Sequence, residues 1–235
     1  MKKSMFVSFR LRDILSLTLV FILTFSIMLS FGFASTTTVA NLKIGENTII
    51  VDAGHGGEDG GTQSSAGVLE KDINLDISMK LGTLLSLLGY NVVYTRTEDT
   101  LHYGADAKVQ RQKKVSDIHY RMGILQAHPD ALFISIHQNY FQQSKYSGAQ
   151  VFYSKNNPES KIVAENIQSS IRNLIQCENE RQIKASSTDI YLLYHAKLPA
   201  VMVECGFMSN AGEALLLCDE DYQKKLCLAI MAGIS

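Results

Sequence analysis

Four residues that can bind a metal ion or transfer a proton stand beside apolar segments of the sequence: His55, Glu70, His137 and Glu204. The apolar segment ALFISI (131–136) runs directly into a histidine, and AVMV (200–203) runs directly into a glutamate. A third segment ends at Asp52 and leads to the first histidine through a glycine-rich loop. If these segments are neighbouring parallel strands, their carboxyl ends meet at the sheet edge where α/β proteins bind ligands.

Two histidines and a carboxylate with a free fourth position form the ligand set of a catalytic zinc site. We therefore consider His55, Glu70 and His137 as zinc ligands. Zinc would polarise a carbonyl group and lower the pKa of a water. Glu204 would then act as general base towards that water and return the proton to a leaving nitrogen. The ligands are far apart in the sequence, so their spacing alone does not establish the site.

Each of these residues also has a structural interpretation. A histidine at a strand end is often a hydrogen-bonded structural residue, and Glu70 suits the positive end of a helix dipole. The glycine-rich loop AGHGGEDGG could bind phosphate, but it has neither a G-K-[ST] ending nor the G-x-G-x-x-G form. Cys205 could be a nucleophile, yet in an extended segment it faces away from Glu204 and is the better core residue. The weaker histidine candidates are His102, His119, His128 and His195.

Strands alternate with helices along the chain. The predicted strands are 47–52, 91–96, 131–137, 148–154 and 200–204, and the predicted helices are 70–88, 116–127, one through 163–174 and one from about 219 onward. The helix at 70–88 has apolar residues at spacings of three and four, and Gly89 is a suitable C-cap. This alternation predicts a single α/β domain with a largely parallel sheet covered by helices on both faces.

The N-terminus predicts export. Four basic residues precede an uncharged stretch at 14–33, and small residues surround a candidate cleavage point before Ser35. The apolar stretch is nearly long enough to span a bilayer, so residues 1–34 are either a signal peptide or an uncleaved membrane anchor. Residues 35–46 are a short linker, and 47–235 form the globular domain. Membrane contact is expected only through the N-terminal segment, and the domain should lie outside the cytoplasm.

The composition of the exported part argues against nucleic-acid binding. Residues 1–34 contain four of the 22 Lys and Arg residues and one of the 23 Asp and Glu residues. The remaining chain therefore has 18 basic and 22 acidic residues. No basic patch with interleaved aromatic residues is present in the sequence. The four cysteines, Cys177, Cys205, Cys218 and Cys227, lack the spacing of a structural zinc site and are expected to be free thiols, with a Cys218–Cys227 bridge as an alternative.

Five segments taken together resemble the zinc-dependent N-acetylmuramoyl-L-alanine amidases of the amidase-3 family. In the order of that family they are IIVDAGHGGEDGG, GVLEKDINLDIS, GYNVVYTRTED, ALFISIHQN and PAVMVECGFMSN, and they extend over nearly all of residues 47–235. The segments RQKKVSDIHYRMGIL and SGAQVFYS further resemble the spore-germination (CwlD-type) members. The resemblance identifies 47–235 as an amidase catalytic domain with a twisted sheet flanked by helices.

The resemblance implies one Zn²⁺ held by His55, Glu70 and His137, with Glu204 as the catalytic glutamate. The implied reaction is hydrolysis of the amide between N-acetylmuramic acid and L-alanine in peptidoglycan. In the germination type this prepares muramic-δ-lactam formation in the spore cortex, with a peptidoglycan deacetylase acting downstream. Asp52, Asp59 and Asn139 are expected to orient ligands or substrate, and Arg96 either does the same or forms a structural ion pair.

Two other functions remain open on the residues alone. A non-catalytic peptidoglycan-binding protein could retain the fold, although a binder needs no general acid or base. A zinc peptidase acting on an exported peptide would share the metal chemistry and differ only in its substrate. The products of the reaction distinguish these functions.

Overall fold

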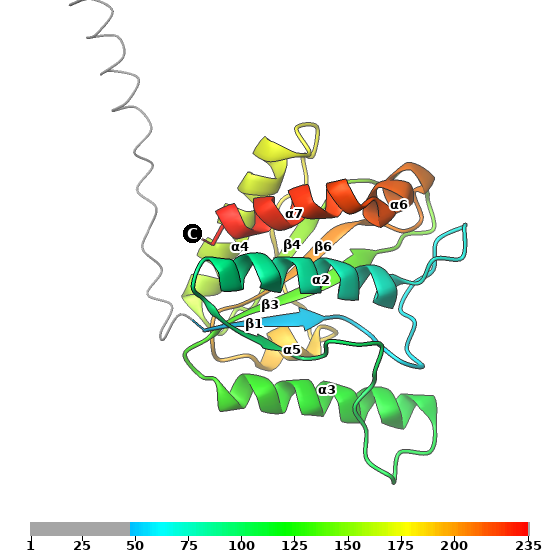
Figure 1. Cartoon of the computed structure of the whole chain (residues 1–235), viewed down its shortest axis with the longest axis vertical. Helices are drawn as coiled ribbons and strands as arrows, with labels where there is room; N and C mark the ends of the chain where they lie inside the picture. The colour runs from blue at the N-terminus through cyan, green and yellow to red at the C-terminus, as the bar shows by residue number, and fades with distance from the viewer. Residues whose placement is uncertain (1–47, 235) are drawn as a thin grey trace, which may run out of the picture. The chain divides into compact units, whose positions relative to one another are not determined.

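A computed structural model describes residues 48–234 of the chain (Figure 1). The predicted signal peptide or anchor at 1–34 and the linker at 35–46 lie outside the described residues. Within the described range, no helix combines the length and apolar character needed to cross a membrane.

A six-stranded sheet forms the centre of the domain. Its strands are β1 (Thr48–Ala53), β2 (Asn91–Tyr94), β3 (Leu132–Asn139), β4 (Gln150–Tyr153), β5 (Lys184–Ala185) and β6 (Ala200–Phe207). The order across the sheet is β2-β1-β3-β6-β4-β5, and every pairing is parallel except β4 with β6. The predicted largely parallel sheet is therefore confirmed, and β1, β3 and β6 are parallel neighbours whose carboxyl ends meet at one edge.

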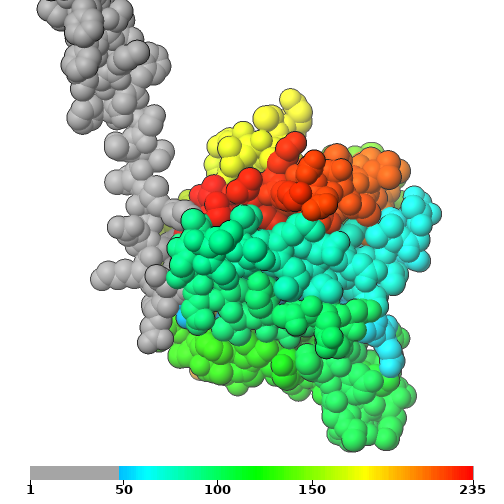
Figure 2. All heavy atoms as spheres, in the orientation of Figure 1, coloured from blue at the N-terminus to red at the C-terminus, as the bar shows by residue number. Residues whose placement is uncertain are grey.

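Helices cover both faces of this sheet. They are α2 (Glu70–Leu87), α3 (Gln110–Ala127), α4 (Pro158–Leu174), α5 (Tyr191–His195), α6 (Ala211–Cys218) and α7 (Glu220–Ala232). Figure 1 shows α2 and α7 on one side of β1 and β3, with α5 and α3 on the other. In the space-filling view, α2 (teal) and α7 (red) pack side by side over the first face (Figure 2).

Two cores lie on opposite faces of the sheet because successive side chains of a strand alternate. Val203 and Cys205 of β6 pack into the larger core with α2, α4 and α7. Met202 packs into the smaller core on the α5 side. Glu204 lies between Val203 and Cys205, and therefore faces the α3 and α5 side. The interpretation of Cys205 as a core residue is confirmed, and all four cysteines of the chain are free.

Two helix boundaries differ from the sequence-based predictions, and one is confirmed. Helix α3 begins at Gln110, because Gln112 Oε1 accepts the backbone N–H of Val109 (3.2 Å) and so caps a turn that has no apolar face. The closing helical stretch is divided into α6 and α7, since the Asp219 side chain accepts the N–H of Tyr222 (2.8 Å) and begins a new helix. The predicted C-cap Gly89 is confirmed, with φ of 89°.

Candidate metal centre

His55, Glu70 and His137 lie together at the carboxyl edge of the sheet. The ligand atoms that they offer all lie within 4.8 Å of one another. His55 follows β1, Glu70 is the first residue of α2, and His137 is in β3. The two imidazole rings meet edge to face, with 4.9 Å between their centres. Two imidazoles and one carboxylate are a donor set that suits Zn²⁺, so these residues fit that ion.

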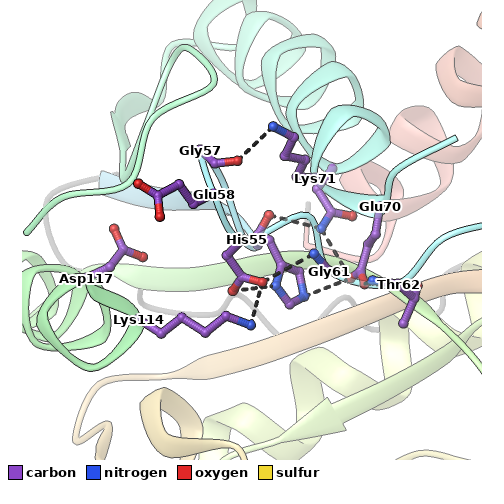
Figure 3. A network of polar contacts seen from close by, with 12 residues as sticks. His55, Gly57, Glu58, Gly61, Thr62, Glu70, Lys71, Lys114 and Asp117 are labelled. Carbon is purple, nitrogen blue, oxygen red and sulfur yellow. Dashed lines mark hydrogen bonds and ion pairs between the residues drawn. The ribbon is translucent and has the colours of Figure 1, made fainter. Parts of the chain in front are cut away.

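His55 has a different carboxylate on each side of its ring. Its Nδ1 is hydrogen-bonded to Asp59 Oδ2 at 2.9 Å, and its Nε2 is 3.3 Å from Glu70 Oε1. Lys114 Nζ pairs with the other oxygen of Asp59 at 2.6 Å (Figure 3). Burial opposes the charged imidazole, but Asp59 and Glu70 outweigh it and raise the pKa of His55 to about 9. A carboxylate behind a histidine is the usual support of a metal ligand, because it fixes the tautomer and the ring orientation.

Glu70 is almost fully buried, with 1% of its surface exposed, yet its carboxylate is well satisfied. Oε2 accepts the N–H of Thr62 at 2.8 Å and its hydroxyl at 3.1 Å. Oε1 accepts the N–H of Gln138 at 3.0 Å and lies 3.0 Å from His137 Nδ1. Burial would raise the pKa of Glu70, but its contacts with His137 and His55 hold it far below its ordinary value. The carboxylate is therefore ionised and fixed, as a metal ligand must be.

Glu204 stands beside the cluster as the register partner of His137 across β3 and β6. Its Oε2 is buried and has no hydrogen-bond partner within the described part of the chain. Burial raises the pKa of Glu204 to about 7, and His137 only partly offsets this. Titration near neutral pH suits a group that first accepts and then donates a proton.

The backbone at His55 is held in an uncommon conformation by two arginines. His55 has a φ of 62°, in the left-handed region that a non-glycine residue rarely adopts. Arg121 donates to the carbonyls of His55 and Ala53, both at 2.7 Å. Arg96 donates to the carbonyls of Ala53 (2.9 Å) and Gly54 (3.0 Å). Surrounding structure that fixes a strained residue in this way is typical of functional sites.

The contacts of Arg96 do not bear out a structural ion pair, one of the two roles considered for it. Its guanidinium donates to backbone carbonyls, including those of Glu98 and Lys71, and no ion pair of Arg96 within 4.0 Å is found among the described residues. The role of Arg96 is therefore to shape the loop between β1 and α2.

Asp52 does not contact the side chains of His55, Glu70 or His137 directly. It lies under the cluster in a buried network, where Arg121 Nη1 is 2.6 Å from Asp52 Oδ1 and Arg121 Nε is 2.7 Å from Asp117 Oδ2. Thr95 and Ser135 donate hydroxyl hydrogen bonds to Asp52 at 2.6 and 2.5 Å. Burial would raise the pKa of Asp52, but Arg121 and the two hydroxyls together lower it. Asp52 thus holds Arg121, which in turn holds the His55 backbone.

Asn139 is the last residue of β3 and is paired with Phe207. Its carbonyl accepts the N–H of Met208 at 2.8 Å, so the structure gives Asn139 a role in joining β3 to the end of β6.

A cavity of about 310 Å³ adjoins His55 and His137 on the α3 and α5 side of the sheet. Lys114 from α3, Tyr191 from α5 and Met202 from the sheet contribute to its lining. The cluster is therefore open to a ligand from this side, while α2 closes it on the other.

The sequence analysis did not identify several residues that support the cluster: Thr62, Asn74, Lys114, Asp117, Arg121, Ser135 and Gln138. Asn74 could have been found, because it follows Glu70 by one helical turn and bonds Glu70 Oε1 at 3.3 Å. Lys114 is in a charged helical segment, and nothing in its spacing distinguishes it from a solvent-exposed lysine.

The chain was compared with known proteins. The amidase-3 family model, described as N-acetylmuramoyl-L-alanine amidase, matches residues 49–235. The germination-specific N-acetylmuramoyl-L-alanine amidase of Bacillus subtilis (strain 168) is 34% identical over 194 residues, which cover 83% of this chain and 81% of that protein. The amidase LytC of the same organism is 34% identical over 206 residues, covering 85% of this chain and 38% of LytC.

A solved structure agrees with these matches. The CwlD amidase from Clostridioides difficile, solved in complex with the GerS lipoprotein, is 43% identical to this chain. The match covers 80% of this chain and 95% of that one, with a TM-score of 0.77. The chain belongs to the amidase-3 family of N-acetylmuramoyl-L-alanine amidases.

Proposed function

We propose that this protein is a zinc-dependent hydrolase that cleaves the amide between N-acetylmuramic acid and L-alanine in peptidoglycan. The observation that carries the proposal is the cluster of His55, Glu70 and His137 with Glu204 beside it, in a chain of an amidase family. Residues 47–235 are the proposed catalytic domain, and 1–34 are the proposed export signal or anchor. The domain would act outside the cytoplasm, as expected from its cell-wall and germination relatives.

His55, Glu70 and His137 would hold one Zn²⁺, the metal expected for this family. When bound, zinc would supply Lewis-acid stabilisation for the scissile carbonyl and make water more acidic. Asp59 would keep the His55 ring oriented through Nδ1, and Thr62 and Gln138 would keep Glu70 in place.

Glu204 would carry the proton transfer. Its carboxylate takes a proton from the attacking water while the water oxygen bonds to the carbonyl carbon. As the carbon–nitrogen bond breaks, Glu204 returns that proton to the nitrogen of L-alanine, so the carboxylate is regenerated. The unpartnered Oε2 of Glu204 and its pKa of about 7 support this assignment.

The germination relatives favour a spore-cortex substrate. In that setting the amidase would expose the muramic acid lactyl group for muramic-δ-lactam formation by a downstream peptidoglycan deacetylase. The CwlD amidase is complexed with the GerS lipoprotein, and we propose that a lipoprotein is a second class of partner for this chain.

The decisive experiment separates the amidase from the peptidoglycan binder and the zinc peptidase. Purified full-length protein is incubated with muropeptides, with and without chelator, and the products are analysed by mass spectrometry. Intact stem peptides with a free L-alanine amine, lost with chelator and restored by zinc, support the amidase. Cleavage within the peptide supports the peptidase, and binding without any product from the zinc-loaded protein supports the binder.

A further inference from the structure

Helix α3 turns one face towards the segment that carries His55. Lys114 and Arg121 lie about two helical turns apart in α3, so their side chains share that face. Arg121 Nη2 donates to the His55 carbonyl at 2.7 Å, and Lys114 Nζ pairs with Asp59 Oδ1 at 2.6 Å. Figure 3 shows Lys114 extending from its helix towards the His55 ring. One helix therefore contacts both the backbone of this candidate ligand and the carboxylate behind its ring.

Asp59 contacts the nitrogen of His55 that lies away from the other candidate ligands. His55 Nε2 is 3.3 Å from Glu70 Oε1, whereas its Nδ1 is 2.9 Å from Asp59 Oδ2. A hydrogen on Nδ1 that is donated to Asp59 leaves Nε2 without a hydrogen, and an imidazole in that form can bind a metal ion. The direction of the Asp59 carboxylate therefore helps to set which nitrogen His55 presents to the cluster.

The backbone of Asp59 is held by the loop, but its carboxylate needs a partner of its own. The Asp59 N–H and carbonyl both bond the backbone of Gly56, at 2.9 Å each. Apart from Lys114, the partner of Oδ1 among residues 48–234 is the N–H of Gly61, at 3.3 Å. A charge-assisted bond of 2.6 Å is the stronger of the two. Lys114 is therefore the contact that turns Oδ2 towards His55.

The exposure of the two partners separates orientation from stability. The Lys114 side chain is 42% exposed, and ion pairs of such lysines contribute little to the free energy of unfolding. The Asp59 side chain is only 13% exposed, and Lys114 also lines the cavity beside His55 and His137. Loss of the lysine should therefore leave the fold intact and act mainly on the direction of the carboxylate.

We propose that Lys114 is a positioning residue of the metal centre, whose ammonium group fixes the Asp59 carboxylate and so holds the His55 ring in the orientation that binds zinc. This inference rests on the proposed function, which makes His55 a zinc ligand. Electrostatic repulsion alone predicts the opposite effect of removing the lysine. A cation near Zn²⁺ repels it, so loss of the charge would tighten zinc binding, whereas loss of positioning weakens it.

The test measures the zinc affinity of the full-length protein by competition with a chromogenic chelator. Lys114→Gln and Lys114→Met are two independent neutral replacements, and Lys114→Arg keeps the charge. Lys113→Gln is the matched control, because Lys113 is the adjacent lysine of α3 and pairs with Glu58. In the described range, Glu58 forms no ion pair with a candidate ligand. Circular dichroism and thermal unfolding establish that each variant is folded.

Both neutral variants should bind zinc about 3- to 10-fold more weakly than wild type, a smaller loss than for Asp59→Asn because the carboxylate remains. Lys114→Arg should recover most of the affinity, and Lys113→Gln should match wild type. In the Asp59→Asn background, Lys114→Gln should have no further effect, since the lysine acts through that carboxylate. Saturating zinc should restore the turnover of muropeptides by the Lys114 variants.

Tighter or unchanged zinc binding in the neutral variants would overturn the role of Lys114, and so would an equal loss with and without the Asp59 carboxylate. Normal zinc affinity with turnover that stays low at saturating zinc would also overturn it, because Lys114 would then act on the substrate. A wild type that binds zinc but releases no stem peptide would overturn the proposed amidase and leave the positioning role standing. A wild type that binds no zinc would overturn both.

Discussion

His137 and Glu204 face each other across two parallel strands, β3 and β6, as partners in the same register. The pairing places the imidazole and the carboxylate on one face of the sheet and at the same level along the strands. A shift of one residue in either strand would turn one of the two side chains to the opposite face. Backbone hydrogen bonding of the sheet therefore sets the separation between the candidate metal ligand and the proposed proton acceptor.

Glu204→Gln should strongly reduce turnover without removing the metal. Loss of the proton-transfer group should reduce kcat about 10²- to 10⁴-fold, while the three proposed ligands remain. Released stem peptide and bound zinc per protein are the two measurements. Glu165→Gln, on the exposed side of α4, is the matched control and should behave as wild type. Full activity of Glu204→Gln would contradict the assigned role.

Asp59→Asn should weaken zinc binding. The amide keeps the shape of the carboxylate but removes the charge behind His55 Nδ1, which should lower zinc affinity about 10- to 100-fold. Competition with a chromogenic chelator measures the affinity. Asp76→Asn removes an exposed carboxylate of α2 and should leave the affinity unchanged. Equal affinities for the two variants would mean that Asp59 does not support the metal site.

Gly54→Ala should damage the centre through steric displacement. A Cβ at Gly54 would lie 2.2 Å from Nε2 of His137, so the ring must shift from the position in which it contacts Glu70. We expect lower zinc occupancy and lower activity, with the fold retained. Gly123→Ala is the control, because a Cβ there meets no atom within 4 Å and alanine favours the helix α3. Circular dichroism together with zinc analysis distinguishes lost occupancy from unfolding.

Asp52 should make folding stability depend on acid pH. Its pKa is below the ordinary value of 3.8, so its contribution to the free energy of unfolding is complete above that value and is lost as the pH falls. Urea unfolding between about pH 5 and pH 3 should show a steeper loss in wild type than in Asp52→Asn. At pH 7 the variant should be less stable, because Arg121 loses one of its two buried carboxylate partners. Identical pH slopes would show that another group controls acid unfolding.

The sequence was sufficient to predict those helices and strands whose pattern of apolar residues reflects their burial. The apolar spacing of Ile73, Ile77 and Leu81 predicted α2 within one residue of its observed end, and all three residues are buried. The apolar runs before His137 and Glu204 predicted β3 and β6, because strands covered on both faces are apolar throughout.

The supporting contacts could not be predicted in the same way. Arg121 bonds the His55 carbonyl across 66 residues, and Ser135 bonds Asp52 across 83. Such pairs leave no periodic signal, since each depends on the order of strands in the sheet. The left-handed φ of His55 could not be predicted either, because the glycines that surround it could have taken any unusual backbone angle.

The place of β6 in the sheet has a consequence for biosynthesis. β6 is the last strand of the chain, yet it lies between β3 and β4 in the interior of the sheet. Until β6 inserts, no strand joins β3 to β4. The pairing of β6 with β3 is long-range in the sequence, and such pairing is a slow kind of folding step. The three candidate metal ligands are synthesised well before Glu204. A growing chain can therefore gather its candidate metal ligands early, and the proposed proton-transfer group joins them only when β6 closes the sheet.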